Sequence, residues 1–153
     1  MNEYMKIAKE LSEKNLKTRD GGPFGACIVK DGEVIGKGRN MVLKTNDPTA
    51  HAEVTAIRDA CKKIGSYDLS GCVLYTSCYP CPMCLSATIW ANIKTVYYGN
   101  TAKDAAEIGF RDDYIYDYMK ESDEDVVDLE PLDRDETIKA FIAFDSDKNK
   151  TIY

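Results

Sequence analysis

The pattern of apolar and polar positions predicts a helix and then a β-hairpin at the start of the chain. Apolar side chains recur at helical spacing over residues 2–18, and Gly21-Gly22-Pro23 then interrupts this pattern. Two strand-like runs, 24–30 and 33–40, flank Asp31-Gly32. This dipeptide accepts the positive φ angles of a tight turn, so the two runs are expected to pair as a hairpin.

Helices and strands alternate after the hairpin. The elements are expected at residues 50–64 (helix), 72–78 (strand), 82–92 (helix) and 94–98 (strand). Thr49 is the expected N-cap of the first helix and Gly65 its stop. Pro82 suits the first turn of the second helix, where its missing N–H is not needed. Such alternation predicts a mixed β-sheet covered by helices on both faces.

Composition and charge limit the class of protein. A chain of 153 residues with 44% hydrophobic content is expected to form one domain, residues 1–153. We expect a cytoplasmic location and no membrane partner, because neither a leader nor an apolar run of roughly 18 residues is present. A reducing compartment favours thiols or metal ligands over disulfides for the six cysteines. The net charge of −6 argues against a nucleic-acid partner, which would need a basic surface.

Two short motifs carry the candidate chemistry. His51, the only histidine, stands two residues before Glu53, and Cys81 and Cys84 lie in a Pro-Cys-x-x-Cys sequence. His-x-Glu followed by Pro-Cys-x-x-Cys is the signature of zinc deaminases. A structural zinc site usually has four protein ligands, whereas a catalytic site has three and leaves the fourth position to water. We therefore expect one catalytic Zn²⁺ held by His51, Cys81 and Cys84, with Glu53 as the group that carries protons.

The predicted elements explain how these residues could meet. His51 and Glu53 fall in the first turn of one helix, and Cys81 and Cys84 fall at the start of the other. Side chains three residues apart lie on the same face of a helix. The partial positive charge at a helix N-terminus also stabilises thiolates.

Two other interpretations of the cysteines remain open. Cys78 could act as a fourth ligand, which would make the chain a zinc-stabilised binding module without turnover. We expect instead that Tyr79-Pro80 ends the strand and turns Cys78 away from the pocket. A redox role for Cys81 and Cys84 is disfavoured by the His-x-Glu motif on the preceding helix. The other cysteines lie in apolar surroundings and are expected in the core: Cys27, Cys61 and Cys72.

The sequence resembles the cytidine-deaminase-like zinc hydrolases, and among them the short bacterial guanine deaminases. The resemblance is carried by residues 21–26, Asn40, 46–58, 74–78, 80–84 and 104–110, and by the terminal Tyr153. It implies a three-layer α/β/α sandwich with a mixed sheet of about five strands. It also implies zinc-dependent hydrolytic deamination of guanine to xanthine and ammonia, with a small-molecule purine as the partner.

The resemblance implies roles for several pocket residues. Asn40 would hydrogen-bond the purine edge, and the backbone N–H of Ala52 would meet a ring acceptor. Phe24 and Trp90 would wall a flat pocket, since aromatic faces suit a heterocycle; ordinary core positions are the alternative for both. Asp112 would be a second carboxylate that handles protons at the leaving amino group, although the adjacent Asp113 is an alternative register.

The C-terminal segment has a role only through the resemblance. Read alone, Tyr153 is a frayed end. In guanine deaminases a terminal tyrosine reaches the active site within a segment exchanged between two subunits. This implies a homodimer in which residues 121–153, with their C-terminal helix, are swapped and 121–131 form the hinge.

The sequence departs from the family pattern at Tyr79, where glutamate is common, and at Arg111. Arg111 could pair with a carboxylate or touch substrate, so a nucleoside such as guanosine remains an alternative substrate. Deamination of cytosine or a related nucleoside is a further alternative. A tRNA adenosine deaminase shares both motifs but should present a basic surface.

Overall fold

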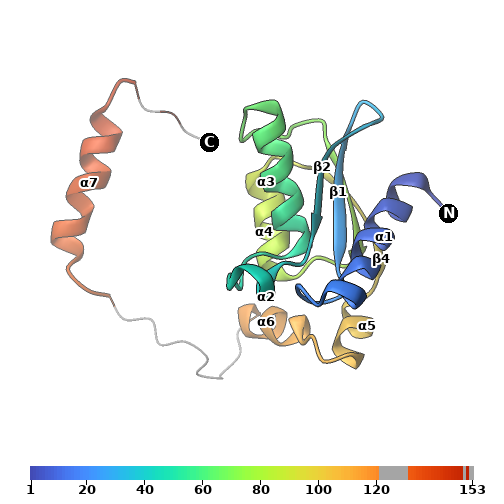
Figure 1. Cartoon of the computed structure of the whole chain (residues 1–153). Coiled ribbons are helices and arrows are strands. Elements are labelled where there is room, and N and C mark those ends of the chain that lie inside the picture. Colours follow the sequence, from blue (N-terminus) through green and yellow to red (C-terminus); the bar gives the residue numbers. More distant parts are fainter. Residues whose placement is uncertain (121–130, 150, 152–153) are drawn as a thin grey trace.

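A mixed four-stranded sheet with helices on both faces organises the computed structural model, which describes residues 1–120, 131–149 and 151 (Figure 1). The strands are β1 Gly25–Lys30, β2 Glu33–Arg39, β3 Val73–Cys78 and β4 Thr95–Asn100. The helices are α1 Glu3–Thr18, α2 Val42–Thr45, α3 Ala52–Ile64, α4 Pro82–Trp90, α5 Ala102–Glu107, α6 Asp112–Met119 and α7 Arg134–Ser146.

The strand order is β2-β1-β3-β4. β1 pairs antiparallel with both β2 and β3, whereas β3 and β4 are parallel, so the sheet is mixed as predicted. Asp31 and Gly32 connect β1 and β2 with positive φ angles of 49° and 81°, which confirms the predicted hairpin turn. The parallel pair places the carboxyl end of β3 beside that of β4, and the loop after β3 leads to Cys81.

The predicted three-layer sandwich is confirmed: α1 packs on one face of the sheet, and α3 and α4 lie on the other (Figure 1). The helices and strands predicted from the sequence begin and end within two residues of the observed bounds. The expected fifth strand does not occur among the residues that the structure describes.

One helix cap differs from the prediction. His51, and not Thr49, is the N-cap residue of α3. Thr49 is held in the preceding turn, because its hydroxyl and its backbone N–H both donate to Asp47 Oδ1, at 2.6 and 2.8 Å. The chain therefore enters the helix two residues later, with the imidazole at its first turn.

Close contact between α3 and β2 fixes the position of the helix that carries the site. Ala52 and Ala56 are buried against Gly36 and Gly38 of β2. A Cβ atom on Gly38 would lie 2.2 Å from the carbonyl oxygen of Ala52, and one on Gly36 would lie 2.5 Å from that of Ala56. Only glycine at these two strand positions allows the helix backbone to lie so close to the sheet.

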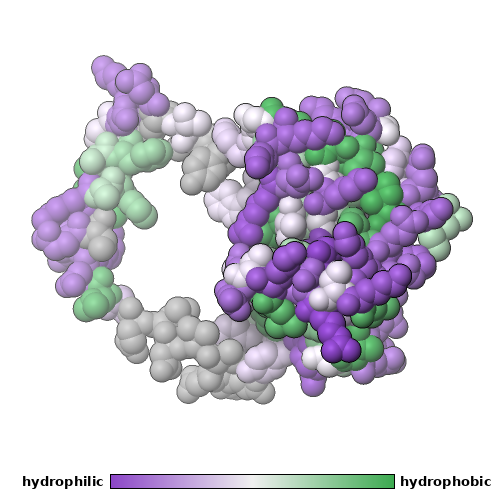
Figure 2. Space-filling model, viewed as in Figure 1, coloured by the Kyte–Doolittle hydropathy of each residue, from purple (hydrophilic) through white to green (hydrophobic). Residues whose placement is uncertain are grey.

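Burial of the cysteines and the lengths of the helices test two further predictions from the sequence. Cys27 and Cys72 are buried as expected, whereas Cys61 is only half-buried. No helix within the described part of the chain is long and apolar enough to span a membrane. Helix α7 lies apart from the sheet layers (Figure 1), and Figure 2 shows apolar surface on it. The exposed apolar residues of α7 include Phe141 and Ile142.

Candidate active site

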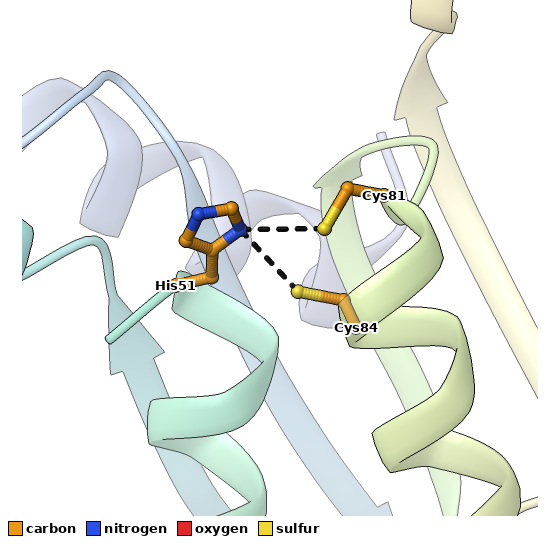
Figure 3. A group of neighbouring side chains, drawn as sticks. All are labelled: His51, Cys81 and Cys84. Carbon is orange, nitrogen blue, oxygen red and sulfur yellow. Dashed lines mark hydrogen bonds between the residues drawn. The ribbon is translucent and has the colours of Figure 1, made fainter. Parts of the chain in front are cut away.

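Three potential metal ligands meet where α3 and α4 begin. His51 is the N-cap of α3, Cys81 is the N-cap of α4, and Cys84 lies in the first turn of α4. His51 Nδ1 lies 3.5 Å from each of the two Sγ atoms (Figure 3). The three ligand atoms all lie within 4.8 Å of one another. The structure therefore brings together the three residues that the two motifs predicted.

The spacing of these atoms fits a tetrahedral zinc ion. Zinc binds sulfur at about 2.3 Å and nitrogen at about 2.0 Å, so two such ligands of a tetrahedron lie about 3.5 Å apart. This is the separation between His51 Nδ1 and either thiol sulfur. Two cysteines and one histidine are also a donor set that zinc prefers, and they leave one position of the tetrahedron open.

Cys78 does not belong to the cluster. Among the described residues the group that could hold a metal is His51, Cys81 and Cys84, and the Cys78 thiol donates to the Thr101 carbonyl oxygen at 3.5 Å. A four-ligand structural site is therefore not supported. One detail of the prediction was wrong, because Cys78 still lines the pocket.

Hydrogen bonds among the three ligand side chains favour the thiolate form of one cysteine, which is the form that binds a metal. Hydrogen bonds from the Cys84 thiol and from His51 lower the pKa of Cys81 to about 4. The hydrogen bond with Cys81, together with burial, raises the pKa of Cys84 above that of an ordinary thiol. A zinc ion at this place would displace the remaining thiol proton and bind two thiolates.

Glu53 is buried beside the ligands, with 6% of its surface exposed. Burial raises the pKa of this carboxyl group, because desolvation disfavours the charged form. The hydroxyl of the buried Thr76 on β3 opposes this effect by donating to Glu53 Oε1 at 2.9 Å. A carboxylate whose proton affinity is increased and whose position is fixed is suited to acid–base catalysis.

A pocket of about 360 Å³ opens in front of the metal ligands. Its size lies in the range of small-molecule sites. It is lined by Gly21, Gly22, Phe24, Asn40, Val42, Leu43, Pro48, His51, Glu53, Cys78, Tyr79, Cys81, Phe110 and Asp112. A mostly apolar lining with a few polar side chains can hold a flat heterocycle next to the reacting groups.

Asn40 is buried in the pocket wall at the end of β2. Its Oδ1 accepts a hydrogen bond from the backbone N–H of Val42 at 3.1 Å. This contact fixes the orientation of the amide, since only the oxygen can accept from an N–H group. The amide nitrogen makes no hydrogen bond with the described residues and is available to a ligand in the pocket.

Three aromatic side chains line the pocket: Phe24, Tyr79 and Phe110. The rings of Phe24 and Phe110 are 4.9 Å apart at 89°, an edge-to-face pair. Tyr79, the departure from the family pattern, lines the pocket and packs edge-on against Tyr98 at 5.0 Å. Phe24 was one of the two aromatic residues predicted to line the pocket, whereas Phe110 and Tyr79 were not predicted.

The two adjacent acids Asp112 and Asp113 face different surroundings. Asp112, the first residue of α6, lines the pocket, and burial raises the pKa of its carboxyl group. Asp113 forms an exposed ion pair with Arg111, with Arg111 Nε 3.0 Å from Asp113 Oδ1. The placement agrees with the register that assigns the second carboxylate to Asp112; its role stays a prediction.

Two predicted residues, Trp90 and Ala52, are not among the described residues that line the pocket. Trp90 is the last residue of α4, a nine-residue helix of about 13 Å whose first turn carries the site, and it is 63% exposed. The expectation that Trp90 walls the pocket of this chain was therefore wrong. Ala52 is fully buried and does not line the pocket, and the role of its backbone N–H stays a prediction. Tyr153 lies outside the described residues.

Sequence reasoning missed several residues that shape the site. Pro48, Thr76 and Phe110 lie in segments that carried the resemblance but had no assigned role. Leu43 lies in a connection without clear periodicity. A hydroxyl in the middle of a buried strand was the one available signal for Thr76, because a buried polar group needs a partner.

Comparisons with known proteins agree with this geometry. Residues 1–100 match the family described as cytidine and deoxycytidylate deaminase zinc-binding region. The chain is 48% identical over 151 residues to the guanine deaminase of Bacillus subtilis (strain 168), covering 98% of this chain and 97% of that relative. The X-ray structure of guanine deaminase from Bacillus subtilis matches with a TM-score of 0.93 and 47% identity, over 100% of this chain and 99% of that chain. A tRNA-specific adenosine deaminase from Aquifex aeolicus (strain VF5) is 46% identical over 95 residues, 62% of each protein. With its His/Cys/Cys cluster and its three-layer fold, this chain belongs to the cytidine and deoxycytidylate deaminase family of zinc-binding proteins.

Proposed function

We propose that the protein is a zinc-dependent guanine deaminase, which hydrolyses guanine to xanthine and ammonia. The observation that carries this proposal is the extent of the similarity. The match to a guanine deaminase covers 98% of the chain, whereas the match to a tRNA-specific adenosine deaminase covers 62%. Phe110 and Asp112 line the pocket and lie beyond residues 1–100, the region that marks the family as a whole.

Glu53 is the proposed proton carrier. When bound, Zn²⁺ would supply a water molecule that is acidic enough to act as a nucleophile at neutral pH. Glu53 would take a proton from the attacking water and deliver it to a ring nitrogen of the purine. The Thr76 hydroxyl holds one oxygen of this carboxylate in place. Asp112 would handle the protons at the amino group that leaves.

Substrate recognition is assigned to the walls of the pocket. The free amide nitrogen of Asn40 would donate to an acceptor on the purine edge, and the backbone N–H of Ala52 would donate to a ring nitrogen. Phe24 and Phe110 would contact the flat ring. A pocket polar group left without its partner costs about 1 to 3 kcal/mol, so Asn40 alone could discriminate among purines about tenfold or more.

We further propose a homodimer in which the C-terminal segment is exchanged. Helix α7 lies apart from the sheet layers and exposes Phe141 and Ile142. Exposure of such large apolar side chains to water is unfavourable, so this surface is expected to have a partner. A second copy of the chain could cover this surface. Sedimentation of the full chain should show a dimer; a monomer at micromolar concentration would contradict the exchange. A cytoplasmic location stays a prediction from sequence.

The experiment that tests the proposed activity is a substrate panel. The zinc-loaded protein is incubated separately with guanine, guanosine, adenine, cytosine and tRNA, and ammonia release is measured. Guanine should be the preferred substrate by kcat/KM. Preferential release from tRNA, from guanosine or from cytosine would replace the proposal with the corresponding alternative. No release from any of them by a protein with stoichiometric zinc would show that the chain is not a deaminase of these compounds.

A further inference from the structure

A buried amide outside the pocket connects two segments of the pocket wall. Asn15 lies in the last turns of α1 and is 3% exposed. Its Nδ2 donates to the carbonyl oxygens of Gly22 and Asn40, both at 2.7 Å. Gly22 and Asn40 line the pocket, whereas Asn15 does not. One side chain on α1 therefore ties together two strips of backbone that face the substrate.

The other end of the amide is also fixed. Asn15 Oδ1 accepts a hydrogen bond from Arg39 Nη1, and Arg39 forms an ion pair with Asp20. The side chains of Arg39 and Asp20 are each only 14% exposed. Because the amide nitrogen faces two carbonyls and its oxygen faces a guanidinium group, the orientation of Asn15 is determined and both of its ends are satisfied.

The same network reaches a third part of the wall. The backbone oxygen of Asp20 accepts hydrogen bonds from the backbone N–H groups of Leu43 and Lys44, both at 3.0 Å. These residues belong to α2, and Leu43 lines the pocket. The ion pair between Asp20 and Arg39 thus holds α2 in relation to Asn15.

The segments that Asn15 joins are in close contact. A Cβ atom on Gly21 would lie 2.1 Å from Asn40 Oδ1 and 2.8 Å from the Asn40 backbone oxygen. The Gly21-Gly22 segment therefore lies directly against the amide proposed to read the purine edge. A small outward movement of either segment would change where the Asn40 amide nitrogen points.

We propose that Asn15 is a positioning residue for substrate recognition: it fixes the backbone on both sides of Asn40 and so determines the direction in which the Asn40 amide donates to the purine. This inference rests on the proposed function, and it assigns to α1 a role in the same site. Arg39 and Asp20 support Asn15 from the side away from the pocket.

The test is a double-mutant cycle on the full-length, zinc-loaded protein. Asn15→Asp keeps the oxygen that faces Arg39 but removes both N–H donors. Since the contact concerns binding more than proton transfer, KM for guanine should rise about tenfold while kcat stays within about twofold. In the Asn40→Ala background the same change should alter KM by less than about twofold, because the residue through which Asn15 acts is then absent.

A control separates positioning from general destabilisation. Leu69→Ala removes a fully buried core side chain that does not line the pocket. It should lower the melting temperature and leave KM unchanged at a temperature where the protein is folded. If Leu69→Ala raised KM as much as Asn15→Asp, or if the effects of Asn15→Asp and Asn40→Ala on KM multiplied, the positioning role would be refuted.

Two further measurements test the role of Asn15 if the Asn15→Asp variant does not fold or if the protein does not convert guanine. If Asn15→Asp does not fold, Arg39→Lys keeps the charge beside Asp20 but loses the guanidinium contact to Asn15, and should raise KM about threefold; an unchanged KM would refute the role. If the wild-type protein converts no guanine, the proposed function fails first. A crystal structure of the zinc-loaded Asn15→Asp variant, or of Arg39→Lys in its place, then decides the inference: a displaced Asn40 side chain supports it, and an unmoved one overturns it.

Discussion

Replacing Thr76 by valine should move the pH dependence of the reaction. The Thr76 hydroxyl is buried on β3 and donates to Glu53 Oε1 at 2.9 Å. Valine has a similar shape but no donor, so Glu53 would lose a hydrogen bond that favours its charged form. Burial already raises the pKa of this carboxyl group, and the substitution would raise it further.

The size of the effect follows from the contact that is lost. A hydrogen bond to a charged group contributes about 1.5 to 3 kcal/mol, and one pH unit corresponds to about 1.4 kcal/mol. The proposed mechanism needs the Glu53 carboxylate as a base, so activity is present above its pKa and is lost as the pH falls. The acid limb of kcat/KM should therefore move to higher pH by about one to two units in Thr76→Val.

The assay is the pH profile of kcat/KM for guanine with wild-type protein, Thr76→Val and Thr88→Val. Thr88 is a matched control, since its hydroxyl is equally buried but donates to the Cys84 backbone oxygen at 2.8 Å. Thr88→Val should leave the acid limb in place. An unmoved limb in Thr76→Val, or an equal movement in both variants, would refute the assignment of Glu53 as the titrating base.

Four further variants test other parts of the site. Glu53→Gln should keep its zinc by metal analysis and lower kcat about 10²-fold to 10⁴-fold; near-normal turnover would exclude Glu53 as the proton carrier. Gly38→Ala would place a Cβ atom 2.2 Å from the Ala52 carbonyl oxygen, so it should displace α3 and lower both the melting temperature and zinc retention; retained wild-type values would show that α3 does not need this close approach. Asp112→Asn should lower kcat at least about tenfold, whereas Asp113→Asn, which only breaks an exposed ion pair, should change it less than about twofold; equal effects would contradict the separation of the two acids.

The elements that the sequence predicted are those with a sustained apolar period and a clear stop. Helix α3 ends as expected at Gly65, which adopts a φ of 69°. Helices α2, α5 and α6 have four, six and eight residues, and such short segments contain too few turns for a helical period to be recognised.

The metal ligands were predictable because their chemistry is encoded in local spacing. His51 and Glu53 are two residues apart, Cys81 and Cys84 are three apart, and each pair falls at the start of a helix. Once the fold places the two helix starts side by side, the ligand set follows. The walls of the pocket are different, because they depend on which loops meet in space.

Trp90 and Asn15 show two ways in which prediction of the site from the sequence failed. Trp90 was assigned to the pocket by resemblance, but it lies at the end of α4 remote from the ligands. Asn15 was overlooked, although it is a polar residue two turns after the buried Ala8 on the inner face of α1. Its position indicated a buried polar contact, but its partners come from the loop before β1 and from the end of β2, and local periodicity contains no information about either.

The central claim is that this chain hydrolyses guanine with a water molecule activated at the His51, Cys81 and Cys84 site. The most direct measurement is the reaction of the zinc-loaded protein with guanine in water enriched in ¹⁸O, followed by mass spectrometry of the product and quantification of ammonia. The mechanism predicts xanthine that carries a single ¹⁸O atom, with ammonia released in equal amount. Xanthine without the label, or no xanthine from protein with stoichiometric zinc, would contradict it.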